Sequence, residues 1–435
     1  MELLIILLYC SLVCFCISRI KFFSNSGIKI KWWILIFLLK VIVGILYGYI
    51  HSFSYGGGDT LYAFNRGIRI YNLIASHGFS VYAKLVFLPC HYPPYAGIDR
   101  WTHNDLSYGD ESYYLLVRLH AIFALISFGY YNVHVVLFNI LSFMGVVLTY
   151  FSFKRVLNEK SILLLLGCCC IPSIVFWTSG IHKDGLALLG ISFLFFSIQK
   201  NSLPVILKIF SAALGLILLW IIRPYIIIIF LPLLPVYLFF QERKSGVIIY
   251  YLTSISLAVI FSLLVSYFIP SYSLFAKITW WQQAFAQLET TPNSVYLPAM
   301  KGDFISFLSV LPYSILHSFF EPFIWRSSNI YQLIISVQDM LLLLFLFYFF
   351  IKRIRAQKMI PHLFYLSIGY AFGLYILLGM IVPNLGALSR YKSTGTLFLF
   401  MAVLSLVPDD WDLRIAQFFS GKSLKSNIPS DLVSQ

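Results

Sequence analysis

The residues most able to do chemistry form a short polar patch, Tyr55-Gly56-Gly57-Gly58-Asp59-Thr60, directly after an apolar segment at 33–50. About 20 residues of helix cross a bilayer, so a carboxylate just beyond that segment lies at the water boundary. Glycines let the backbone approach a ligand closely. Asp59 is therefore a candidate general base, and Tyr62 and Arg66 are candidate substrate-binding residues. The alternative is a tight turn with a solvated aspartate.

Three further polar groups stand where apolar segments end. They are Trp177-Thr178-Ser179-Gly180-Ile181-His182-Lys183-Asp184, Arg223-Pro224-Tyr225, and 384–392. Arginine offers phosphate a planar fork and lysine a point charge. We therefore predict a set of substrate-binding residues, namely His182, Lys183, Arg223, Arg390, Tyr391 and Lys392. A polar hairpin tip, or an arginine that snorkels to water, would give the same pattern without function.

The sequence contains no metal-binding or thiol motif. His91, His103 and His120 share a predicted loop with Asp99 and Asp105, but their spacing matches no metal motif. We therefore predict no metal site and no certain cofactor, with a divalent metal as the alternative. Six of the seven cysteines lie in apolar segments and no C-x-x-C occurs, which argues against thiol chemistry. Neither common nucleotide-binding glycine motif is present.

The composition is that of a membrane protein. The chain has 435 residues, of which 60% are hydrophobic and 11% charged, and its mean hydropathy is +0.85. A soluble domain carries about 25% charged residues. The net charge of +14 is better explained by basic cytoplasmic loops than by nucleic-acid binding. These values predict an all-α, polytopic transmembrane helix bundle.

About eleven apolar segments are candidate spans. They are 3–17, 33–50, 133–152, 161–177, 185–199, 203–221, 224–240, 246–268, 330–351, 360–381 and 394–407. Lysines and arginines cluster at 19–31, 154–160, 243–244 and 352–358, which marks these segments as cytoplasmic.

This arrangement puts the N-terminus outside. It predicts a single bundle at 1–407, large outer loops at about 52–132 and 269–329, and a short cytoplasmic tail at 408–435. Within the loops, 113–128 and 303–320 are predicted to lie along the outer interface, although 113–129 could instead span. Segment 3–17 is predicted to be a retained helix rather than a signal peptide.

The order of these elements resembles the GT-C superfamily of integral-membrane glycosyltransferases, which includes protein O-mannosyltransferases and the lipid A aminoarabinose transferase. The resemblance covers most of residues 33–407. In that family an outer loop after an early helix bears the catalytic acid and the next outer loop bears another, and Asp59 and Asp184 match these places. An Arg-Tyr pair before a terminal span is also common there, and Arg390-Tyr391 fits it.

The sequence also departs from the family. Thr60 follows Asp59, where many members have an Asp-Glu pair, and Lys392 is not followed by the prolines common after Arg-Tyr. A large soluble domain after the bundle is absent from these residues, and segment 3–17 is an additional first helix. The departures concern the subfamily and the acceptor more than the class.

The resemblance implies an inverting hexosyl- or pentosyltransferase in a bacterial inner membrane, with its active site on the periplasmic side. Its partners would be a polyprenyl-phosphate sugar donor, a glycan, lipid or protein acceptor, and membrane lipid, without nucleic acid. One alternative is a lipid-linked polysaccharide polymerase or ligase, with its key groups in 269–329. A second is a lipid-linked glycan transporter or flippase, which predicts ionisable residues inside the bundle. Only Asp339 and Lys40 lie well inside predicted spans.

Overall fold

A computed structural model describes residues 1–54, 58–88, 111–199, 204–240, 243, 245–287, 294–327 and 329–408. Over these ranges the chain folds into helices and forms no strand, apart from one isolated bridge between Ser294 and Asn384. The prediction of an all-α polytopic bundle is confirmed.

Seven helices in the described ranges are long and apolar enough to cross a membrane. They are α1 (Glu2–Arg19), α3 (Ile30–Ser54), α8 (Tyr131–Leu157), α12 (Val205–Ile222), α15 (Val247–Phe268), α18 (Ile330–Arg355) and α19 (His362–Ile381). An eighth span results if α9 (Ser161–Cys170) and α10 (Pro172–Ser179), which are bent by 67°, are counted as one. The chain is therefore a multi-pass membrane protein.

The predicted number of about eleven full spans was too high. Besides the bent pair, three expected spans are short helices: α11 (Lys183–Ser197), the pair α13 (Pro224–Phe230) and α14 (Leu233–Phe239), and α21 (Ser393–Leu406). Pro172 and Pro232 lie at two of the breaks, and proline lacks the N–H that continues a helix. The 14 residues of α21 reach about 21 Å, less than the ~30 Å hydrocarbon core.

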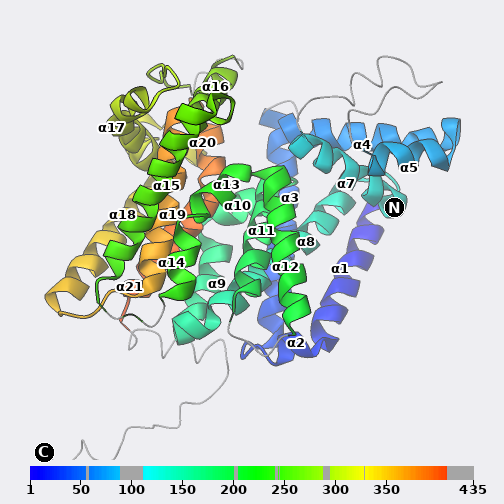
Figure 1. Cartoon of the computed structure of the whole chain (residues 1–435). Helices are drawn as coiled ribbons and strands as arrows, with labels where there is room; N and C mark the ends of the chain where they lie inside the picture. The colour runs from blue at the N-terminus through cyan, green and yellow to red at the C-terminus, as the bar shows by residue number, and fades with distance from the viewer. Residues whose placement is uncertain are drawn as a thin grey trace, which may run out of the picture.

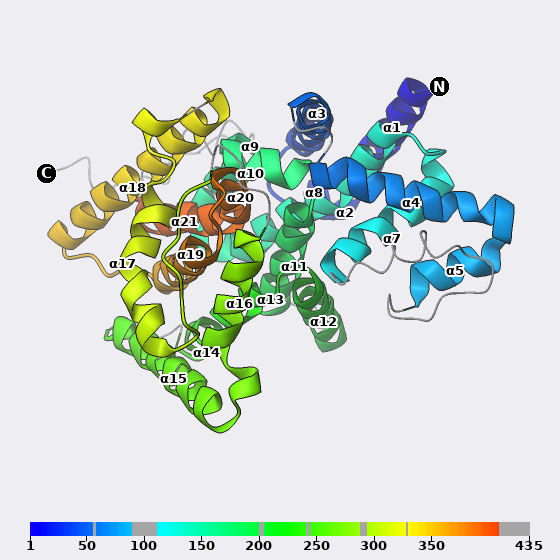
Figure 2. The same ribbon diagram turned by 90° about the horizontal axis from the view of Figure 1, so that it is seen from above.

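The two predicted outer loops contain helices that gather at one end of the bundle, here called the site end (Figure 1). The first loop holds α4 (Gly58–His77), α5 (Phe79–Phe87) and α7 (Glu111–Ser127). The second holds η2 (Pro270–Tyr272), α16 (Leu274–Ala286), α17 (Phe304–Phe320) and η3 (Ile324–Arg326). Figure 2 shows α4 lying lengthwise and reaching outward from the bundle, with α7 beside it. The short helix α20 (Leu385–Tyr391) lies at the same end.

The basic clusters lie together at the opposite end, where α2 (Lys21–Ser24) joins α1 to α3. Contacts between distant segments show this. Lys154 donates to the carbonyl of Ser26 at 2.6 Å, and Lys160, in η1 (Asn158–Lys160), donates to that of Val407 at 2.6 Å. Arg353 Nη1 lies 3.4 Å from the Leu406 carbonyl oxygen. The tail from 409 onward lies outside the described residues.

Helix α11 is held in the middle of the bundle by glycines that allow close approach to its neighbours. A Cβ atom on Gly215 of α12 would lie 2.7 Å from the carbonyl oxygen of Gly190 on α11. A Cβ on Gly145 of α8 would lie 3.1 Å from the backbone of Leu189. Small residues at such crossings let helix backbones pack tightly in a membrane. This packing fixes the N-terminal turn of α11 at the site end.

Candidate active site

Four separate segments bring charged side chains together around Arg390. Its Nη1 atom lies 3.2 Å from Asp59 Oδ2 and 3.2 Å from His182 Nε2. Its Nη2 atom donates to the Tyr391 hydroxyl at 2.9 Å, and its Nε atom lies 3.9 Å from Asp184 Oδ2. The cluster joins residues up to 331 positions apart in the sequence.

Arg223 completes this cluster from the break between α12 and α13. Its Nη2 atom lies 2.9 Å from Asp184 Oδ1, and its guanidinium carbon lies 4.0 Å from the centre of the Tyr391 ring. The backbone of Arg223 is non-helical, and Pro224 begins the next helix, where its missing N–H costs nothing. The break therefore turns the arginine toward the site.

The carboxylates come from the first turns of two helices. Asp59 lies in the first turn of α4, and Asp184 lies in the first turn of α11, two residues after its N-cap residue His182. A negative charge is favourable at a helix N-terminus. The two differ sharply in exposure, because the Asp59 side chain is 62% exposed and that of Asp184 only 3%. One acid thus faces outward while the other is an internal counter-ion.

His182 is neutral in this setting. Burial, together with the positive charge of Arg390, holds the pKa of His182 well below its usual range. An unprotonated Nε2 atom is a hydrogen-bond acceptor, which agrees with its position 3.2 Å from Arg390 Nη1. His182 thus orients the guanidinium without adding charge.

Tyr391 lies between the two guanidinium groups. Burial alone would raise the pKa of its phenol, but Arg390, Arg223 and Lys183 outweigh burial and leave the pKa below its ordinary value. The ring also contacts Phe285 of α16, with centroids 6.0 Å apart. Tyr391 therefore separates two positive charges and joins the site to α16 of the second outer loop.

Six of the ten predicted site residues lie in this cluster: Asp59, His182, Asp184, Arg223, Arg390 and Tyr391. Lys183 turns toward α7, where its Nζ atom donates to the Ser112 hydroxyl at 2.5 Å.

The remaining three predicted residues lie outside it. On α4, Arg66 hydrogen-bonds the Tyr62 hydroxyl, and its guanidinium carbon lies 4.1 Å from the centre of the Tyr62 ring. Lys392 is buried on another side, with Nζ 2.7 Å from Asp339 Oδ2. The intramembrane Asp339 is thus the partner of a predicted site lysine.

Sequence reasoning did not assign roles to residues that hold the site's backbone in place. Lys40 of α3 is fully buried and donates to the Thr178 hydroxyl at 3.0 Å and the Ser179 hydroxyl at 3.1 Å. Asn139 of α8 donates to the Ser179 carbonyl at 2.8 Å. These contacts fix the end of α10, just before His182. The signal available in the sequence was a lysine inside a predicted span.

A second contact fixes the start of α4. The hydroxyls of Thr60 and Tyr131 lie 2.8 Å apart and join α4 to the beginning of α8. Thr60 therefore anchors the helix that carries Asp59. The glycines at 56 and 57 lie outside the described residues.

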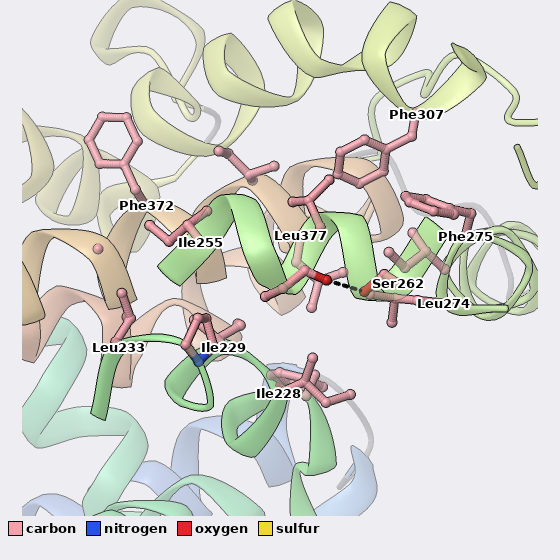
Figure 3. Close-up of a pocket in the computed structure, with 18 of the residues that line it drawn as sticks. Ile228, Ile229, Leu233, Ile255, Ser262, Leu274, Phe275, Phe307, Phe372 and Leu377 are labelled. Atoms are coloured by element: carbon pink, nitrogen blue, oxygen red, sulfur yellow. Dashed lines mark hydrogen bonds between the residues drawn. The ribbon is translucent and has the colours of Figure 1, made fainter. Parts of the chain in front are cut away.

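An apolar cavity of about 400 Å³ lies next to the charged cluster, between α13, α15, α16, α17 and α19. Phe275 and Phe307 line it from the second outer segment, and Ile229 lines it from α13 (Figure 3). Tyr225 connects cavity and cluster. Its ring centre lies 5.8 Å from the Arg223 guanidinium carbon and 6.3 Å from the ring of Trp281, which also lines the cavity.

Metal binding is not indicated by the part of the chain that the structure describes, where no three His, Cys, Asp or Glu side chains come together. His91, His103, Asp99 and Asp105 lie outside the described residues. His120 instead pairs with His134 of α8, with their Nδ1 atoms 2.8 Å apart.

Comparison with known proteins gives no relative: no family model, curated protein or solved structure matches this chain. The assignment of function therefore depends on the geometry of the site.

Proposed function

We propose that this protein is a membrane glycosyltransferase of the GT-C type. It moves a sugar from a polyprenyl-phosphate donor to a hydroxyl of a lipid, glycan or protein acceptor, with inversion. The observation that carries the proposal is the position of Arg390, which lies against the carboxylates of Asp59 and Asp184 in a cluster bordered by an apolar cavity. Such a donor needs cations for its phosphate, a carboxylate near its sugar and an apolar path for its chain.

The chemistry assigns a role to each charged group. Asp59 takes the proton from the acceptor hydroxyl as its oxygen attacks the anomeric carbon. The bond between that carbon and the phosphate oxygen breaks, and its electron pair leaves with the polyprenyl phosphate. Arg390 and Arg223 offset the charge that develops on the leaving phosphate, while the buried Asp184 holds both guanidinium groups.

The cavity supports a donor with a long apolar chain. Its lining is almost entirely aliphatic and aromatic, and Tyr225 lies between it and Arg223. An amphiphile with its phosphate at the arginines would have its first isoprene units beside Tyr225 and Trp281. Burying each methylene-sized group contributes about 0.8 kcal/mol, so a chain in this cavity adds substantially to affinity.

We also propose that the site faces the periplasm of a bacterial inner membrane. Basic clusters favour the cytoplasm, and the clusters containing Lys154, Lys160 and Arg353 lie at the end opposite Asp59.

The proposal is tested by transfer in a purified system. Protein in lipid nanodiscs is incubated with radiolabelled polyprenyl-phosphate hexoses and pentoses and with a membrane extract as acceptor. We expect label to enter a lipid, glycan or protein fraction, and Asp59→Asn to lower turnover by about 10²–10⁴ because the amide cannot accept a proton. Glu2→Gln, which removes a carboxylate that accepts from the Asn132 N–H at the same end, serves as the control.

Two results would contradict this function. Transfer at the wild-type rate by Asp59→Asn would show that Asp59 is not the general base. Transfer that depends instead on Glu321, whose carboxylate lies 2.7 Å from His317 in the second outer segment, would favour the polymerase or ligase alternative.

A further inference from the structure

We propose that Asp59 and Arg390 form an exchangeable ion pair: the phosphate of the donor takes the place of Asp59 on Arg390, and its arrival releases Asp59 to act as the base. This inference rests on the proposed function and adds an order of events to it. The donor must bind before the acceptor hydroxyl can lose its proton.

The Nη1 atom of Arg390 already has two hydrogen-bond partners. Nη1 is shared between Asp59 and His182, Nη2 is taken by the Tyr391 hydroxyl, and Nε faces Asp184. Nη1 has two N–H groups and two acceptors, so a phosphate oxygen that binds this atom must displace Asp59 or His182.

Asp59 is the neighbour that leaves. Asp184 is 3% exposed and is held by Arg223 at 2.9 Å, and His182 is buried at the N-cap of α11. Tyr391 is adjacent to Arg390 in the chain and is held between two guanidinium groups. Only Asp59 is largely exposed, at 62%, with one 3.2 Å contact to the arginine. Exposed ion pairs contribute little, so this contact is the easiest to exchange.

The exchange also changes the state of the base. While Asp59 accepts from Arg390, one of its oxygens is occupied by the guanidinium, and its charge is balanced. A phosphate that replaces it satisfies Arg390 and frees a carboxylate on the exposed side of the cluster.

The test measures binding rather than transfer, with polyprenyl monophosphate and inorganic phosphate as the probes. If Asp59 competes with phosphate for Arg390, then Asp59→Asn removes the competitor and tightens binding of both probes by about two- to fivefold. Asp59→Ala should act in the same direction, which guards against a local effect of the amide. The matched control, Glu2→Gln, also removes one negative charge at the site end and should leave both affinities unchanged.

Several results would overturn the exchange. They are equal or weaker binding by both Asp59 variants, equal tightening by Glu2→Gln, and no binding of either probe by any of the proteins. Failure of the proposed function has a different signature. Tighter phosphate binding by Asp59→Asn, with no sugar transfer by any of the proteins, would support the exchange and exclude the proposed function. Transfer that requires Asp59, with phosphate binding unchanged in its variants, would support Asp59 as the base and exclude the exchange.

Discussion

Arg223 Nη2 lies 2.9 Å from Asp184 Oδ1, with both side chains almost excluded from solvent. This buried pair joins the break between α12 and α13 to the first turn of α11. The same two residues also form the inner wall of the candidate active site. The pair therefore couples the stability of the fold to the shape of the site.

Loss of one partner should destabilise the protein strongly. Arg223→Ala leaves a buried carboxylate with less compensation, which costs about 3–5 kcal/mol. The double variant Arg223→Met with Asp184→Leu should recover part of that loss, because the carboxylate and its partner are removed together while Arg390 keeps its contact with Asp59. Thermal unfolding followed with a thiol-reactive dye on the buried Cys168 and Cys169 measures both. Strictly additive effects would contradict the coupling.

The exposed pair between Arg326 and Glu321 provides the matched control. Their atoms lie 3.8 Å apart and Arg326 is 69% exposed. Arg326→Ala should change the unfolding free energy by about 0–1 kcal/mol.

His182 should make the protein less stable in acid. Its pKa is lowered on folding, so below the usual value of about 6.5 the unfolded chain binds a proton that the folded chain does not. Stability then falls as the pH drops below that value, by up to about 1.4 kcal/mol per pH unit. His182→Gln should flatten the dependence of the unfolding temperature on pH between 7 and 5. An unchanged slope in this variant would show that His182 is charged in the folded state.

Filling the apolar cavity should discriminate between donors by chain length. Ala258 of α15 lines the cavity, and the neighbouring Leu257 is exposed on the same helix. Ala258→Trp should weaken binding of a long-chain polyprenyl phosphate about tenfold or more, with little effect on a five-carbon prenyl phosphate, because only the long chain enters the cavity. Leu257→Trp should affect neither in a thermophoresis titration. An equal loss for both ligands would place the chain elsewhere.

The orientation in the membrane can be checked by labelling single cysteines in a cysteine-free background. An impermeant maleimide added from outside should reach positions 59 and 391 and miss positions 154 and 353, since the two sets lie at opposite ends of the bundle. Outside labelling at 154 would reverse the proposed orientation.

The sequence allowed the class of fold and most members of the charged cluster to be predicted, because charged residues next to apolar spans are disfavoured unless something uses them. It could not show which of them meet. Arg390 and Lys392 are two residues apart, about 200° around a helix, so they face different partners, Asp59 and Asp339. The contact between Asp59 and Arg390 depends on how α4 and α20 pack, which no local pattern records.

The number of spans was overestimated for a related reason. Mean apolarity does not register the direction of the chain, so the bend at Pro172 and the break at Pro232 were counted as continuous helix. Prolines in apolar segments are tolerated when neighbouring groups satisfy the freed backbone.

The bend between α9 and α10 also links distant parts of the sequence. The free N–H of Ser173 donates to Gln338 Oε1 of α18 at 2.9 Å, across 165 residues, and Gln338 Nε2 donates to Asp339, the partner of Lys392. A homologous helix transplanted in place of α18 would have to bring this amide and carboxylate with it, or the bend would lose its support in the hydrocarbon. One chain of hydrogen bonds therefore links α10, α18 and the segment that bears Arg390.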